Sequence, residues 1–348
     1  MALDGLEGLA SAVIVIVFSR VRHGKGLSAA QTGGSNMSGL DSLLHRRPPT
    51  AWDNFKSNPL LFLAQKVYGW SQPTASTTST GGIQVVCISD THSTHHTQPA
   101  LPTGDILIHS GDLTHSGSPD ELHDALDWLS SHPHPVKIFV AGNHDASLAD
   151  PETRQQILSV YPSLIYLENS STEVTVRERP LRIYGSPYTP KHGSWQFQYP
   201  RVSPRSYSRD QVGPQATEIW SSIPPLTDIV VTHGPPFSHL DLSRTGCYAL
   251  LTAIWRVRPR LHVFGHIHAA RGVEYLTWNE AQALYEDICA GIAGWGGLAR
   301  LVWWVTVGNM RERFGGRDGD RGRTILVNAA AVGGLRDDER KGAIVAKV

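Results

Sequence analysis

The stretch that decides the fold is I-Q-V-V-C-I-S-D-T-H, residues 83–92, where an apolar, β-branched run leads directly into Asp90 and His92. A short apolar run of this kind is typical of a strand that is buried on both faces of a sheet. The aspartate and the histidine follow at the point where the chain leaves that strand. Residues 83–92 therefore predict a buried strand that carries two metal-binding residue types at its carboxyl end.

The same kind of apolar run recurs along the chain. We expect further strands at residues 105–110, 136–141, 181–185, 228–232, 261–264 and 324–328. Helices open at the capping box S-P-D-E, residues 118–121, and at Asp150 before a proline. Residues 173–183 indicate a hairpin that turns near Arg179 and Pro180. Strands joined partly by helices and partly by hairpins predict a layered α/β fold with two sheets.

Composition excludes several classes of protein. The 348 residues allow one large domain or two small ones, and the 31 basic residues equal the 31 acidic ones. This neutral balance argues against a protein that coats nucleic acid or anionic lipid. A hydrophobic content of 40% is enough for a folded core. Cys87, Cys247 and Cys289 form no C-x-x-C pair, which indicates buried thiols in a reducing compartment, and we expect a cytoplasmic location.

The chain divides at residue 83. We expect residues 1–82 to form a poorly ordered N-terminal extension that ends in a Ser/Thr-rich linker, followed by one domain at residues 83–348. Within the extension, the apolar residues 59–70 indicate a docking helix. Within the domain, residues 291–323 are rich in Gly, Arg and Trp and are predicted to form a surface insertion.

A second apolar run occupies residues 9–18. As a helix, ten residues span about 15 Å, which is about half the hydrocarbon thickness of a bilayer. Asp4 and Glu7 precede the run where a signal peptide would carry Lys or Arg. We interpret residues 9–18 as a peripheral segment, with an interfacial membrane contact as the alternative.

Metal-binding residue types follow nearly every predicted strand. The loops at the carboxyl ends of strands in an open α/β sheet converge on one crevice, so these residues are expected to meet there. The candidate ligands are Asp90, His92, Asp112, Asn143, His233, His266 and His268. They are too many for one tetrahedral zinc and suit two metals with near-octahedral nitrogen and oxygen shells. Asp112 has two carboxylate oxygens and can bridge two ions.

No single motif of this set is specific. An Asp-x-His pair arises by chance in a chain with 17 histidines, and Gly111-Asp112 is a common turn. The order D-x-H, G-D, G-N-H-D, H-G and G-H-x-H, with each element after a strand, is specific. This order resembles that of the calcineurin-like metallophosphoesterase superfamily over about residues 83–334. Residues 185–190 and 232–236 resemble the corresponding segments of one branch of this superfamily, the metallophosphoesterase domain-containing proteins. This is a branch of small phosphodiesterases.

The resemblance implies a four-layer α/β/β/α sandwich of two mixed β-sheets and a site for two divalent metal ions. Manganese is the expected metal, with iron or zinc as alternatives. One ion would be held by Asp90, His92, Asp112 and His268, and the other by Asp112, Asn143, His233 and His266. His144 would be a catalytic imidazole that is not a ligand. Asp145 is expected either to orient His144 or to cap the helix that follows.

The implied function is hydrolysis of a phosphodiester by in-line attack of a metal-bridging hydroxide, with His144 as proton donor. Protein phosphatases of the superfamily carry G-D-x-x-D-R-G, whereas residues 111–117 read G-D-L-T-H-S-G. The missing Asp-Arg pair favours a small phosphoester, such as a cyclic nucleotide, over a phosphoprotein. The alternatives are a metal-loaded but weakly active scaffold, and a phosphomonoesterase or nuclease of the same superfamily. The chain lacks a basic stripe, so we expect no stable nucleic-acid complex.

Overall fold

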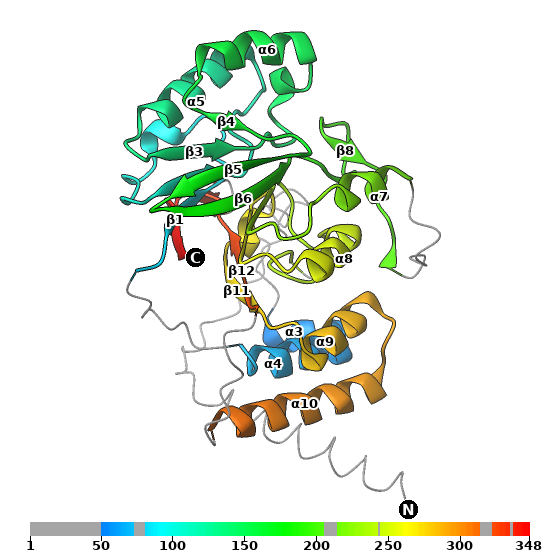
Figure 1. The fold of residues 1–348 in the computed structure, drawn as a ribbon. Coiled ribbons are helices and arrows are strands. Elements are labelled where there is room, and N and C mark those ends of the chain that lie inside the picture. The colour runs from blue at the N-terminus through cyan, green and yellow to red at the C-terminus, as the bar shows by residue number, and fades with distance from the viewer. Residues whose placement is uncertain (1–49, 73–80, 205–213, 243, 314–321, 335–336) are drawn as a thin grey trace, which may run out of the picture.

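The computed structural model describes residues 50–72, 81–204, 214–242, 244–313, 322–334 and 337–348. Two mixed β-sheets pack face to face, and helices cover their outer faces (Figure 1). The first sheet has the order β15 (Ile344–Lys347), β1 (Gln84–Ile88), β2 (Ile106–His109), β3 (Val136–Phe139) and β4 (Ile165–Tyr166). Strands β1 to β4 are parallel, and β15 is antiparallel to β1.

The second sheet has the order β11 (Gly272–Leu276), β12 (Thr324–Asn328), β10 (Leu261–Phe264), β9 (Ile229–Thr232), β6 (Arg179–Ser186) and β5 (Ser170–Val176). Its central strands β6, β9, β10 and β12 are parallel, and the edge strands β5 and β11 are antiparallel to their neighbours. Two short pairs complete the strands, β7 (Thr189–Pro190) with β8 (Gln198–Tyr199) and β13 (Val332–Gly333) with β14 (Glu339–Arg340). Each predicted strand, and the predicted four-layer sandwich, is confirmed.

Burial on both sheet faces explains the continuous apolar runs. Val85 and Cys87 of β1 point into the core between the sheets. Their neighbours Val86 and Ile88 point outward and are also buried, against the helical layer. Successive side chains of a strand face opposite ways, so a strand that is covered on both sides needs apolar residues at every position.

Helices α5 (Pro119–Ser131) and α6 (Pro151–Val160) cover the first sheet, and α7 (Pro214–Ser221) and α8 (Tyr248–Val257) cover the second (Figure 1). Ser118 Oγ accepts a hydrogen bond from Glu121 N at 3.3 Å, and Asp150 Oδ2 accepts one from Thr153 N at 2.8 Å. These side chains satisfy amide groups that the first helical turn leaves free, as the sequence predicts.

The predicted hairpin forms, but its turn lies elsewhere. Arg177 and Glu178 make the turn, with φ angles of 48° and 63°, and Pro180 lies in β6 opposite Thr175. Strand β6 begins to pair with β9 only at Ile183. Pro180 therefore lies on a stretch where its missing N–H does not interrupt the ladder to β9. The predicted turn near Arg179 and Pro180 was wrong by two residues.

A helical region packs beside the sandwich. It consists of α3 (Ala51–Ser57), α4 (Pro59–Gly69), α9 (Glu280–Ala290) and α10 (Trp295–Arg313) (Figure 1). Leu63 and Val67 of α4 share a core with Ile288 of α9 and Leu301 of α10. The docking helix predicted at residues 59–70 is confirmed.

Two helices of this region were not predicted from the sequence. Helix α3 lies within the stretch that was predicted to be a poorly ordered extension, and α10 lies within the predicted insertion. Residues 9–18 and most of the linker lie outside the described residues. Among the helices that the structure describes, none has the length and apolar character needed to cross a membrane.

His239 joins the helical region to the second sheet. Its ring is buried, with Nδ1 2.8 Å from Glu274 Oε1 on β11 and Nε2 3.0 Å from Glu286 Oε1 on α9. Glu286 also accepts a hydrogen bond from Trp255 Nε1 at 2.6 Å. Burial alone would lower the pKa of His239, but the two glutamates outweigh it and raise that pKa to about 10. The imidazole is therefore a cation between two carboxylates at neutral pH.

We expect the free energy of unfolding to fall between pH 7 and pH 10 because of His239. A histidine whose pKa is raised in the folded state stabilises it fully below the unfolded pKa of about 6.5, and this stabilisation is lost as the pH rises through about 10. The decline should be on the order of a few kcal/mol. Urea unfolding at several pH values measures it. His239→Gln should flatten the decline, and His123→Gln on α5 is the control. Equal slopes in all three proteins would contradict the assignment.

Candidate metal centre

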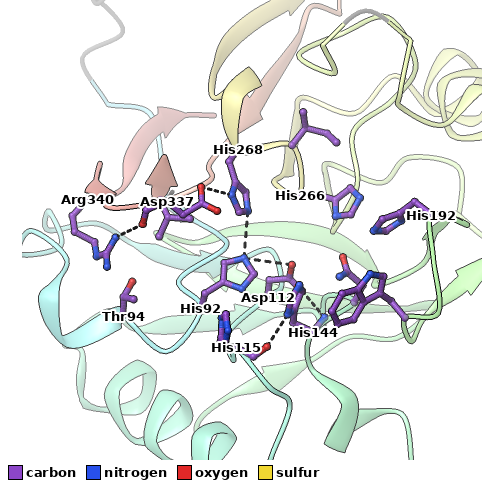
Figure 2. Close-up of a pocket in the computed structure, with 14 residues that line it drawn as sticks. His92, Thr94, Asp112, His115, His144, His192, His266, His268, Asp337 and Arg340 are labelled. Atoms are coloured by element: carbon purple, nitrogen blue, oxygen red, sulfur yellow. Dashed lines mark hydrogen bonds and ion pairs between the residues drawn. The ribbon is translucent and has the colours of Figure 1, made fainter. Parts of the chain in front are cut away.

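Residues that follow four strands, β1, β2 and β3 of the first sheet and β10 of the second, meet at one pocket of about 560 Å³ (Figure 2). His233, which follows β9 of the second sheet, is buried beside them and does not line the pocket. The structure brings all the predicted ligands together: Asp90, His92, Asp112, Asn143, His233, His266 and His268. Asp90, Asp112, Asn143 and His233 are buried, and the others are partly exposed toward the pocket.

One group of ligand atoms gathers around His268. Its Nε2 lies 3.3 Å from Asp90 Oδ1 and 3.3 Å from His92 Nε2. The Asp90 carboxylate also accepts hydrogen bonds from His266 N at 2.9 and 3.0 Å. Asp90 therefore ties the loop after β1 to the loop after β10, across the two sheets.

The second group gathers around His233. Its Nε2 lies 3.0 Å from Asn143 Oδ1, 3.1 Å from His266 Nδ1 and 3.3 Å from Asp112 Oδ2. Neighbouring ligand atoms in an octahedral shell with bonds of about 2.1 Å are about 3 Å apart. His233 Nε2 therefore has three donor atoms at the distance expected of neighbours in a coordination shell.

Asp112 lies between the two groups. Its Oδ2 is 3.3 Å from His233 Nε2 and 3.7 Å from His92 Nε2, while its Oδ1 accepts a hydrogen bond from His144 N at 2.8 Å. The carboxylate is thus fixed by the backbone of one loop and faces imidazoles of two others. This is the position that a bridging ligand needs.

The donor set fits divalent cations. Facing imidazole nitrogens, such as His92 Nε2 and His268 Nε2, can satisfy each other only when one of them carries a proton. Two buried carboxylates face the same space. Nitrogen and oxygen donors without a thiolate suit manganese, iron or zinc. The residues present therefore fit the two ions that the sequence predicts.

The charges around Asp112 and Asp90 keep both carboxylates in the ionised form that a metal ligand needs. Burial would raise the pKa of Asp112, but the charge and hydrogen bond of His233 outweigh it and hold that pKa well below its usual range. Burial opposes ionisation of Asp90 as well, and His268 lowers its pKa to about 2. Both carboxylates are ionised at neutral pH.

The imidazoles fall into two classes. Burial lowers the pKa of His266 to about 3, and it also lowers the pKa of His92, so both rings are neutral. Burial opposes protonation of His233 and His268 too, but their aspartate neighbours outweigh it and raise both pKa values to about 9. A metal ligates neutral imidazole, so binding must displace these two protons.

Further hydrogen bonds set the ring orientation of two predicted ligands. His233 Nδ1 donates to the Ser110 carbonyl at 3.0 Å, which leaves Nε2 facing the ligand group. His268 Nδ1 lies 2.8 Å from Asp337 Oδ1. Such partners fix the tautomer of a ligating histidine and raise its basicity. Asp337 was not predicted, because it follows His268 by 69 residues in a stretch without a ligand motif.

His144 lies beside the predicted ligands, but its orienting partner differs from the one predicted. Its Nδ1 donates to the His115 carbonyl at 2.7 Å. The Asp145 carboxylate instead accepts hydrogen bonds from Thr114 N at 2.9 Å and Gly142 N at 2.8 Å. It makes no side-chain cap for the short helix that follows. Both roles predicted for Asp145 were therefore wrong in their geometry, and its carboxylate joins the two loops instead.

Other side chains that line the pocket were not predicted from the sequence. Trp195 is 48% exposed and stacks on His144 with ring centroids 4.3 Å apart. His192 lies beside His266, and Arg340 lies on the far side of the pocket near Asp337 (Figure 2). His192 shares one weak signal with the predicted ligands, since a glycine adjoins it in a loop. Trp195 and Arg340 follow no motif, and only the fold brings them here.

The backbone at several predicted ligands is left-handed. The φ angles are 54° at Asp90, 42° at His92, 53° at Asp112 and 68° at His266. Non-glycine residues in this region cost on the order of 1–2 kcal/mol each, and they persist where surrounding contacts hold them. The loops at the strand ends are therefore tightly constrained by their neighbours.

The sandwich and the site together are consistent with one family of proteins. Residues 83–270 match the family model described as calcineurin-like phosphoesterase, and the chain belongs to this family. The predicted superfamily is confirmed.

The chain is also similar in sequence to three known proteins. The chain is 42% identical over 315 residues to "Probable rhamnogalacturonate lyase C" of Emericella nidulans, covering 88% of this chain and 28% of that protein. It is 41% identical over 221 residues to "Metallophosphoesterase domain-containing protein 1" of Homo sapiens, covering 56% of this chain and 63% of that protein. A Caenorhabditis elegans relative, "UPF0046 protein K07C11.7", is 30% identical, with 64% and 76% covered. The chain thus spans less than two thirds of the first two relatives.

We expect Gly265→Ala to weaken metal binding. A Cβ at this position would collide with the Asp90 carboxylate and the Ser89 side chain, so the loop after β10 must move. Overpacking of this kind costs about 1–3 kcal/mol of stability. Metal content after dialysis and thermal unfolding with and without Mn²⁺ measure both effects. Gly308→Ala in α10, where a Cβ meets open space, is the matched control. Unchanged metal content in Gly265→Ala would contradict the expectation.

Proposed function

We propose that this protein is a dinuclear metal-dependent phosphodiesterase that acts on a small phosphodiester. The observation that carries the proposal is the position of Asp112, whose Oδ2 faces His92 on one side and His233 on the other. One carboxylate in that place would serve two cations. The family of the chain, whose model matches residues 83–270, supports phosphoester chemistry.

Each cation would have four protein ligands. Asp90, His92, Asp112 and His268 would hold one, and Asp112, Asn143, His233 and His266 would hold the other. Bound divalent metals supply a lowered pKa to water and neutralise charge on phosphoryl oxygens. The chain's own contribution is to fix the ligands on rigid strand ends, so that the phosphoester binds to a preformed site.

His144 is the proposed proton donor to the leaving alkoxide. The hydrogen bond from Nδ1 to the His115 carbonyl fixes that nitrogen as the protonated one in the neutral ring. Nε2 is then the nitrogen that must first take up a proton, giving the imidazolium, and then delivers that proton to the leaving alkoxide. Stacking against Trp195 restricts the ring orientation.

The pocket supports a small substrate. A volume of about 560 Å³ lies in the range of small-molecule sites. Residues 111–117 lack the Asp-Arg pair of the protein phosphatases. A small phosphodiester, such as a cyclic nucleotide, is therefore the proposed substrate class. The lyase name belongs to a protein of which this chain covers 28%, and it supports no activity here.

The test is hydrolysis of bis(p-nitrophenyl) phosphate and p-nitrophenyl phosphate by metal-stripped protein titrated with Mn²⁺. We expect turnover of the diester to rise with Mn²⁺ and to exceed that of the monoester. Asp112→Asn removes the bridging charge and should abolish turnover, whereas Asp120→Asn, exposed on α5, should leave it unchanged. Diester turnover would then justify a screen of cyclic nucleotides.

Two outcomes would contradict the proposal. A faster monoester reaction would assign the site to phosphomonoesters. Full binding of two metals without turnover of either compound would support the scaffold interpretation instead.

A second test separates His144 from the ligands. We expect His144→Asn to retain two metals per chain while kcat falls by about 10²–10⁴ for a diester with an alkyl leaving group. The fall should be much smaller for a p-nitrophenolate leaving group, which needs no proton. Equal losses for both leaving groups would assign His144 a structural role.

A further inference from the structure

A second cluster of metal-binding side chains lies apart from the pocket. His95 and His96 belong to the short helix η1 (His95–Thr97), and Asp124 lies on α5. His95 Nε2 is 3.0 Å from Asp124 Oδ2, and His96 Nε2 is 3.1 Å from Asp124 Oδ1. These ligand atoms all lie within 4.8 Å of one another. The described residues that line the pocket of Figure 2 do not include them.

The environment of the His95 ring indicates a bound ligand rather than a simple ion pair. Its side chain is fully buried, and neither ring nitrogen has a hydrogen-bond partner among the described residues. Nε2 is the ring nitrogen that faces Asp124, with Oδ2 at 3.0 Å. A buried nitrogen left in this state costs about 1–3 kcal/mol. A cation bound beside the Asp124 carboxylate would give this nitrogen of His95 a partner.

The surroundings favour the neutral, ligating form of the imidazole. Burial, followed by the charge of the adjacent His96, lowers the pKa of His95. The two rings are 4.3 Å apart, so two imidazolium ions would repel each other. Trp128, one helical turn after Asp124, forms an apolar wall 5.4 Å from the His95 ring.

One side of the cluster is open to solvent. The side chains of His96 and Asp124 are 62% and 56% exposed. Two imidazoles and one carboxylate, with room for water as a fourth ligand, match the coordination that zinc takes in open sites. Harder cations such as Mg²⁺ prefer oxygen ligands and suit this set less well.

We propose that His95, His96 and Asp124 form a separate zinc site on the surface of the protein. A zinc ion here joins η1 to α5. The helix η1 begins three residues after His92, and Thr97 at its end accepts a hydrogen bond from Arg340 Nε at 3.1 Å. The ion would therefore stabilise the segment between the loop after β1 and the wall of the pocket.

The test is the zinc stoichiometry of the full chain. Metal-stripped protein is dialysed against Zn²⁺ and its zinc content is measured by elemental analysis. His96→Ala and Asp124→Asn should each bind one zinc ion fewer per chain than the unsubstituted protein. Because both side chains are exposed, these variants are expected to fold, whereas the buried His95 is left unchanged. Asp120→Asn, one helical turn before Asp124, is the matched control and should keep the full content.

The readout is independent of the pocket. Asp112→Asn should lose zinc from the pocket and still show the loss of one further ion when combined with Asp124→Asn. A zinc-edge anomalous peak between the two histidines and Asp124 in crystals of the zinc-loaded protein would confirm the position. Equal zinc content in the unsubstituted protein, His96→Ala and Asp124→Asn would overturn the proposal and leave the cluster as an ion pair.

Discussion

The buried carboxylate of Asp112 is the constraint on which the rest of the site depends. Contacts reach it from three strand ends: His92 after β1, the backbone of His144 after β3, and His233 after β9. An unbalanced charge in a protein interior is costly, so these groups must all be present around it. The two sheets therefore have to pack in the one arrangement that delivers them.

Around Asp112 the charges are arranged in a connected network. Protons on His233 and His268 offset the carboxylates, and the proposed cations would replace those protons on binding. Behind them, burial and then the charge of Asp112 raise the pKa of Asp145 to about 6. Its carboxylate holds the amides of Gly142 and Thr114 and so links the loops that carry the ligands. Networks of this kind are rigid only when every member is satisfied.

Strands and ligands could be predicted from the sequence because local patterns encode them. Burial on both faces makes β1 a continuous apolar run, and residues after parallel strands share one edge. Other features depend on distant contacts. Asp337 reaches His268 only in the fold, and α10 forms in a Gly-rich stretch because its apolar residues pack on α4 and α9. The role of Asp145 was predicted from its place next to His144 in the sequence. That prediction was wrong because neighbouring residues in a turn point in different directions.

The pairing of β1 with β15 has a consequence for how the chain acquires its structure during synthesis. The ribosome makes β1 first among the strands of its sheet, but its antiparallel neighbour comprises residues 344–347. One edge of β1 stays unpaired until those residues emerge, and an open apolar edge invites association with other chains. Asp337 and Arg340 precede β15 by only a few residues. Closure of the sheet and completion of the pocket therefore coincide, so a nascent chain remains both aggregation-prone and without a finished site until β15 is in place.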